Sequence, residues 1–323
     1  MSCFKRFALG LLLAACAALY AQQPAARVSL HVVALDSAGR PVPDLAESDL
    51  KVFDNGARQK IVSFRLNQTD GPRALVILFD LMNSSLSSRG EIWNIVKNSL
   101  SRLPPANSLY LYLLAEEGSL YAVHGLADSA DPSWVQKIAP LLDDAMRKTL
   151  QLKPHDLTRT SVIALPELFK RTGMALDDLR SRMATLHGPK DLLWITYGFP
   201  SAIRLAGTGW WDGGPLLREL GARFVQSDIT IYTADPAMSL TRGALDRDAL
   251  DILTGATGGH SFSNVDIGRA IAQIEAGARA NYSLEFQPSA ANWNGKYHKL
   301  RVTAARKGVH VETQQGYFAV LGS

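Results

Sequence analysis

The types and spacing of Asp80 and the polar residues after it could bind a ligand or a metal ion. The apolar run at residues 74–79 predicts a strand buried on both faces, and Asp80 ends it, followed by Asn83, Ser84 and Ser85. Many α/β domains present a ligand or metal where such a strand ends. The same residue types also cap helices and satisfy turns, so a structural role is the competing interpretation.

A second candidate is the tryptophan pair Trp210-Trp211, in the segment GTGWWDGGP after the predicted strand DLLWITYG. Loops that follow strands gather at the carboxyl edge of a parallel sheet, so we expect this pair near Asp80 and Tyr197. Aromatic residues are enriched at protein-binding hot spots, which predicts a binding surface. The alternative is that one tryptophan plugs the end of the sheet while the other covers a neighbouring helix.

Sets of residues typical of enzymes are missing from the sequence. The seven histidines are scattered without an HExxH pattern, and there is no GxSxG elbow and no phosphate-binding lysine after the glycines. The only cysteines, Cys3 and Cys16, lie at the very start of the chain, so no thiol nucleophile or disulfide is expected in the body. We therefore predict that the protein is not an enzyme.

Residues 1–21 have the features of a secretory signal peptide. Lys5 and Arg6 precede an apolar run that is shorter than the roughly 20 residues of a membrane-spanning helix. Two processing routes stay open, namely cleavage after Ala21 and lipidation at Cys16 within the lipobox-like sequence LAAC. The sequence thus predicts an exported protein, periplasmic or extracellular, whose only membrane attachment would be a lipid anchor at Cys16.

Charge argues against a nucleic-acid partner. The formal net charge of +4 falls to +2 without the leader, which holds Lys5 and Arg6 and no acidic residue. No basic stripe with interleaved aromatic residues is visible. We therefore expect no nucleic-acid partner.

The chain divides into three further segments by pattern. Residues 27–67 alternate apolar and polar side chains, with a hairpin signal at Asp54-Asn55-Gly56. Residues 71–279 alternate strands and helices, which predicts a doubly wound, mostly parallel α/β sheet. Residues 280–323 return to strands, and we expect them to pack with residues 27–67 as an accessory β module.

Several of these segments together resemble the von Willebrand factor A-related proteins of bacteria such as the Acidobacteria. The matching pieces are VVALDSAGRPVPDLAESDLKVFDNGARQKIVSF, the strand ending at Asp80, GPKDLLWITYGFP, ITIYTADP, LTGATGGHSF and the tail from NYSLEFQPS to QQGYFA. The resemblance implies a von Willebrand A core, of Rossmann-like type, at residues 71–279. It implies no known reaction.

The same resemblance implies a metal ion-dependent adhesion site in a degenerate form. Asp80, Ser84 and Thr160 correspond to ligand positions, but Met82 replaces a serine and Tyr197 stands where an aspartate is expected. A thioether and a neutral phenol are poor ligands for the hard ions Mg²⁺ and Ca²⁺. The expectation is therefore no cofactor, or weakly bound Mg²⁺ or Ca²⁺.

These observations predict a non-catalytic protein-binding or scaffolding module of the cell envelope. Its ligand-binding candidates are Asp80, Asn83, Ser84, Tyr197, Trp210 and Trp211. Two alternatives remain: weak Mg²⁺- or Ca²⁺-dependent adhesion, and an envelope enzyme whose site follows no recognised motif.

Overall fold

A computed structural model of the chain describes most residues after the leader. The described residues are 26–67, 73–83, 93–94, 96–101, 108–128, 132–150, 164–196, 198, 201–204, 209–235, 247–263, 267–279 and 281–320. The predicted signal peptide, with Cys16 and Ala21, lies outside them.

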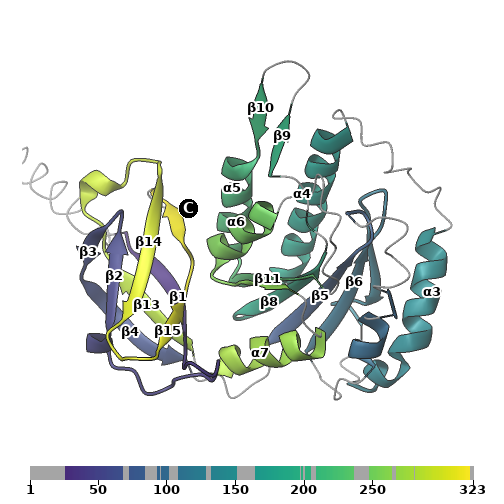
Figure 1. The fold of residues 1–323 in the computed structure, drawn as a ribbon, viewed down its shortest axis with the longest axis horizontal. Coiled ribbons are helices and arrows are strands. Elements are labelled where there is room, and N and C mark those ends of the chain that lie inside the picture. The colour runs from purple at the N-terminus through teal and green to yellow at the C-terminus, as the bar shows by residue number, and fades with distance from the viewer. Residues whose placement is uncertain are drawn as a thin grey trace, which may run out of the picture.

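Strands from both ends of the chain form one β module (Figure 1). One sheet has the order β15-β1-β13-β4, and the other has the order β16-β14-β2-β3. Both sheets contribute to a single apolar core, to which Leu30, Val52, Tyr282 and Val302 belong. The strands are β1 (Val28–Leu35), β2 (Leu50–Asp54), β3 (Ala57–Gln59), β4 (Ile61–Asn67), β13 (Asn281–Phe286), β14 (Tyr297–Ala304), β15 (His310–Glu312) and β16 (Gly316–Phe318), with 3₁₀ turns η1 (Glu47–Asp49) and η3 (Ala290–Asn292).

Local sequence explains the hairpin in this module. Strand β2 ends at Asp54 and β3 begins at Ala57, so the turn consists of Asn55 and Gly56. Both have positive φ, 47° and 85°, as a type I′ hairpin turn requires. Asparagine and glycine adopt this backbone at the lowest cost, which is why the pair predicts a turn here.

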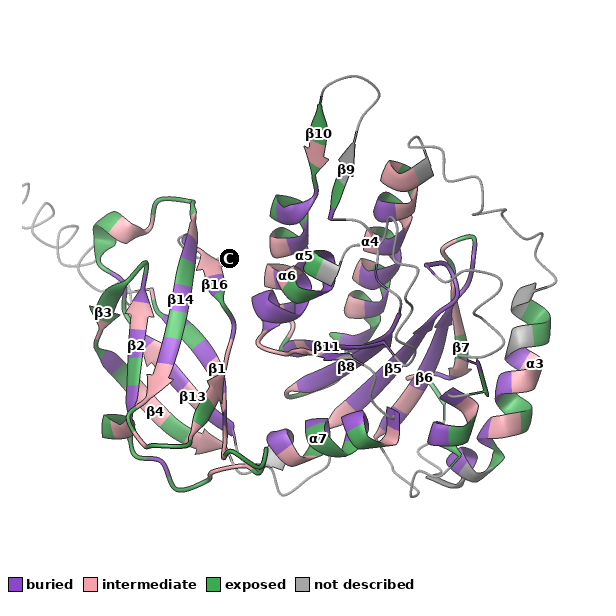
Figure 2. Ribbon diagram, in the orientation of Figure 1, coloured by how far each residue is buried: buried purple, intermediate pink, exposed green. Residues whose placement is uncertain are grey.

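The middle of the chain builds a six-stranded sheet, β12-β11-β8-β5-β6-β7. Its strands are β5 (Ala74–Asp80), β6 (Leu109–Leu114), β7 (Leu120–His124), β8 (Lys190–Ile195), β11 (Ile229–Asp235) and β12 (Ser261–Ser263). All pairs are parallel except β6 with β7. Central strand β5 is buried from Leu75 to Asp80, as its apolar run predicts (Figure 2).

Helices cover both faces of this sheet. One apolar cluster joins it to α3 (Ile138–Leu150), α7 (Ile267–Arg279), the 3₁₀ helix η2 (Pro132–Lys137) and the helical residues 96–100. A second cluster joins the other face to α4 (Ala164–Met183), α5 (Gly214–Gln226) and α6 (Arg247–Thr257). A two-stranded hairpin of β9 (Ala202–Arg204) and β10 (Trp210–Asp212) extends beyond the start of α5 (Figure 1).

The predicted fold class, a doubly wound and mostly parallel sheet, is wrong for the chain. Eight of the twelve strand pairs in the described residues are antiparallel, and the four parallel pairs are confined to the six-stranded sheet. The other three sheets are antiparallel throughout the described strands. The prediction gave most weight to the strand–helix alternation of the middle segment, whereas half of the strand pairs lie in the antiparallel β module formed by the chain ends.

The β module contacts the six-stranded sheet and its helices through the last strands of the chain. The backbone N–H of Gln315 donates to the carbonyl of Gly255 at 2.7 Å, just before the end of α6. Nearby, His260 Nδ1 lies 3.3 Å from Glu312 Oε2. None of the helices that the structure describes is both long and apolar enough to span a membrane.

Candidate functional site

Asp80 lies at the carboxyl end of β5, where its carboxylate accepts hydrogen bonds from four donors. Thr196 Oγ1 and Trp194 Nε1 donate to Asp80 Oδ2 at 2.9 and 3.1 Å. Asn83 donates through its backbone N–H to Oδ1 at 2.9 Å and through Nδ2 to Oδ2 at 2.7 Å. The carboxylate therefore ties the β5 loop to the neighbouring strand β8.

This network continues onto helix α4. Asn83 Nδ2 also lies 3.2 Å from Thr172 Oγ1, and the Thr172 hydroxyl donates to the carbonyl of Leu168 at 2.9 Å. Burial raises the pKa of the Asp80 carboxyl above its ordinary value, although the hydrogen bonds from Asn83, Thr196 and Trp194 act in the opposite direction. Buried polar groups in such a network stabilise one arrangement of the loops.

Met82 is part of the apolar core rather than of this polar network. Its side chain is buried among residues of α4 and β8, in the same cluster as Leu176 and Trp194. The methionine thus has a packing role in the core. Within the described residues, no three His, Cys, Asp or Glu side chains gather closely enough to hold a metal ion.

The two tryptophans have different environments. Trp211 is half-buried and packs edge-on against Phe169 of α4, with ring centroids 4.7 Å apart. Neighbouring residues of a strand point to opposite sides, so Trp210 points away from this contact, and it is 68% exposed. Of the two interpretations of the pair, the helix-covering one describes Trp211, whereas Trp210 presents its ring to the surroundings.

Two further hydrogen bonds fix the base of the hairpin that carries these tryptophans. The backbone N–H of Gly213 donates to the carbonyl of Ser201 at 2.7 Å, and the N–H of Gly214 donates to Asp212 Oδ1 at 2.8 Å. A Cβ at Gly213 would come within 2.8 Å of the rings of Phe169 and Trp211, so only glycine fits beneath the indole.

The described residues thus place Asp80 and Asn83 in one network, and Trp210 and Trp211 on the hairpin that follows β8. Ser84, Thr160 and Tyr197, together with Ser85, lie outside the described residues. Sequence reasoning missed Thr172 and Phe169, because both come from a helix distant in sequence and no motif marks them. Trp194 was part of a predicted strand, but nothing local indicated that its indole would bind Asp80.

Comparison with known proteins gives no family for the chain. No protein family model matches it, and no curated protein is similar to it. Among solved structures, it is similar to the human COPII-coat protein Sec24c, with 10% sequence identity and a TM-score of 0.32. The match covers 77% of this chain and 44% of Sec24c.

Two bacterial structures are also similar. The pilus adhesin SpaC of Lactobacillus rhamnosus GG has 10% identity and TM-score 0.38, over 84% of this chain and 42% of SpaC. A D319A mutant of the minor pilin PilB of Streptococcus sanguinis has 12% identity and TM-score 0.40, over 66% of this chain and 63% of PilB. The chain thus spans less than two thirds of each of these three proteins.

The predicted membership of the von Willebrand factor A-related proteins is wrong. No family model matches, and three of the four sheets in the described residues are antiparallel. The interpretation of residues near Asp80 as a degenerate metal ion-dependent adhesion site is wrong with it. The physical reason lies in the contacts: Asp80 is occupied by four donors of the protein itself, and Met82 fills the core.

Proposed function

We propose that this protein is an exported, non-catalytic module that binds another protein through the β9–β10 hairpin. The basic residues and apolar run at the start of the sequence support export, since they have the pattern of a signal peptide. The absence of catalytic motifs from the sequence supports a binding role rather than a reaction.

The exposure of Trp210 carries this proposal. A tryptophan that is 68% exposed keeps a large apolar area in water, and burial of such a ring in a partner is a major source of binding energy. The hairpin is also prepared for binding, because Trp211 and Asp212 fix its base to α4 and α5. A ring presented from a fixed support loses little conformational entropy when a partner covers it.

Photo-crosslinking tests the proposal in the native cell envelope. The full-length protein carries a benzophenone amino acid in place of Trp210 and, as the control, in place of Val62, an exposed apolar residue of strand β4. We expect an adduct with one protein from position 210, none from position 62, and the same adduct in the presence of EDTA.

Affinity capture with unlabelled variants completes the test. Trp210→Ala should lower recovery of the crosslinked partner about tenfold, whereas Trp210→Phe should retain most of it, because an aromatic anchor contributes about 1–2 kcal/mol or more. Equal adducts at positions 62 and 210, or undiminished capture by Trp210→Ala, would contradict binding through the hairpin.

A further inference from the structure

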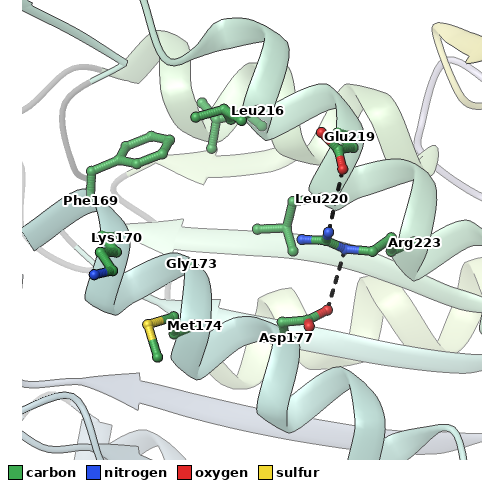
Figure 3. A pocket seen from close by; sticks show the side chains of 10 residues that line it. Phe169, Lys170, Gly173, Met174, Asp177, Leu216, Glu219, Leu220 and Arg223 are labelled. Carbon is green, nitrogen blue, oxygen red and sulfur yellow. Dashed lines mark ion pairs between the residues drawn. The ribbon is translucent and has the colours of Figure 1, made fainter. Parts of the chain in front are cut away.

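A groove between helices α4 and α5 is separate from the exposed face of Trp210. It has a cavity of about 240 Å³ with an apolar floor that includes Phe169 and Leu220 (Figure 3). Met174 and Leu216 stand on its sides and remain 63% and 49% exposed. These are two of the few large apolar side chains that the described residues leave so open.

Helix geometry sets the length of the groove. Its lining residues on α4 recur at four-residue spacing, from Phe169 through Gly173 to Asp177. Eight residues of helix rise about 12 Å, which is a little over two turns. The groove is therefore as long as the i, i+3, i+4 and i+7 positions of a second helix laid along it.

Gly173 lowers the stability of helix α4, and the packing of the protein itself does not explain why a glycine is there. Glycine inside a helix is about 1 kcal/mol less favourable than alanine. A Cβ at Gly173 would meet no atom within 4 Å, so no internal neighbour requires the missing side chain. The open space lies over the floor of the groove, where an occupant would come close to the backbone of α4.

The two ends of the groove differ in their charged side chains. At one end, Arg223 Nε lies 3.4 Å from Asp177 Oδ1, and Arg223 Nη1 lies 3.5 Å from Glu219 Oε1 (Figure 3). At the Phe169 end, Lys170 and Arg171 both act on the single carboxylate of Glu167, which lies 2.8 Å from Arg171 Nε. These three residues carry two positive charges and one negative charge, which favours an acidic side chain on an occupant.

We infer that this groove binds an amphipathic helix of a partner protein, with leucine-like side chains on the floor and a carboxylate at Lys170. A helix fits better than an extended strand, because backbone groups in the middle of a helix such as α4 or α5 pair within that helix and are not free to pair with a strand, whereas a docked helix satisfies its own. The inference does not depend on Trp210, which does not line the groove.

Methyl NMR with a synthetic peptide tests this inference on the full chain after removal of the leader. The probe is an acetylated, amidated helix of about 14 residues with leucines at i, i+3, i+4 and i+7 and glutamates beside them. The readout is the ¹³C-methyl signal of Met174, assigned by its loss in Met174→Leu. We expect a saturable shift with micromolar affinity, and at least fivefold weaker binding when lysines replace the glutamates.

Variants separate docking from a merely structural role. Gly173→Ala should raise the urea midpoint of unfolding and yet weaken peptide binding about tenfold. Lys170→Glu should reverse the preference for the acidic peptide, and Leu216→Ala should weaken binding. Leu141→Ala, which changes an exposed leucine on α3, should not.

Two results would contradict the binding of a helix in this groove. Binding that is unchanged by both Gly173→Ala and Lys170→Glu would overturn the inference, as would a Met174 shift produced by raising the protein concentration without peptide. Trp210→Ala should leave peptide binding intact, so failure of the hairpin proposal and failure of this one give different results.

Discussion

Asp80 shows how one buried carboxylate can organise a loop through hydrogen bonds from the protein's own donors. Its two oxygens accept four hydrogen bonds, from Asn83, Trp194 and Thr196. Asp80→Ala would leave these donors buried without an acceptor, so we expect it to lower the free energy of unfolding by about 3 kcal/mol or more. Thr172→Val, at the edge of the network, should cost about 1 kcal/mol.

Urea unfolding measures the loss of stability in Asp80→Ala and Thr172→Val. The same experiment with millimolar Mg²⁺ tests whether an ion binds at Asp80. Because the protein's own donors already occupy the Asp80 oxygens, we expect Mg²⁺ to leave the midpoint of the wild-type protein unchanged. A midpoint that rises with Mg²⁺ in the wild type but not in Asp80→Ala would contradict this account.

We expect Asp191 to make the stability of the protein depend on pH. Burial raises the pKa of its carboxyl to about 6, although Arg73 Nη2 donates to Asp191 Oδ1 at 2.8 Å and opposes the shift. Between about pH 4 and 6 the folded protein holds a proton that the unfolded chain has released, so this group's contribution to stability falls as the pH rises.

Asp191→Asn isolates this contribution, because asparagine keeps the shape without the titration. The unfolding free energy of the wild type minus that of the variant should fall by up to about 3 kcal/mol from pH 4 to pH 7. Urea titrations at intervals of one pH unit would measure it. A difference that stays level or increases with pH would show that Asp191 is ionised throughout.

Among the helices, strands and turns, local sequence predicts the features that depend only on neighbouring residues. Helix α5 spans Gly214–Gln226 with Pro215 in its first turn, the position in a helix that proline fits best, and the Asn55-Gly56 turn lies where the hairpin signal placed it. The different surroundings of Trp210 and Trp211 could not be read from sequence. They depend on Phe169, which a separate helix brings to one side of the hairpin.

For the whole molecule, the direction in which the strands pair could not be predicted from the sequence. Strand β1 pairs with β13 and β15, which are hundreds of positions away in the chain. Such pairing depends on register and topology rather than on the residues next to each strand. The candidate site shows the same difference. The end of a predicted strand marks Asp80, but Trp194 reaches Asp80, and Thr172 reaches Asn83, only through the tertiary fold.

The close approach between α6 and the last strands of the β module gives a prediction at this scale. Helix α6 ends at Thr257, and Gly258 follows with a φ of 87°. A Cβ at Gly258 would lie 2.9 Å from the backbone nitrogen of Gln314, which belongs to the tail of the β module. Gly258→Ala therefore meets both an unfavourable φ and a backbone atom that cannot easily move.

Gly308→Ala is the matched control, because Gly308 also has a positive φ, 75°, but its Cβ would have no atom within 4 Å. We expect Gly308→Ala to lower the free energy of unfolding by about 1 kcal/mol, from the backbone alone, and Gly258→Ala to lower it by about 2–4 kcal/mol. Urea unfolding of both variants measures the difference. Equal losses would mean that the β module can shift away from α6 at little cost, so that the contact does not hold the two parts of the molecule together.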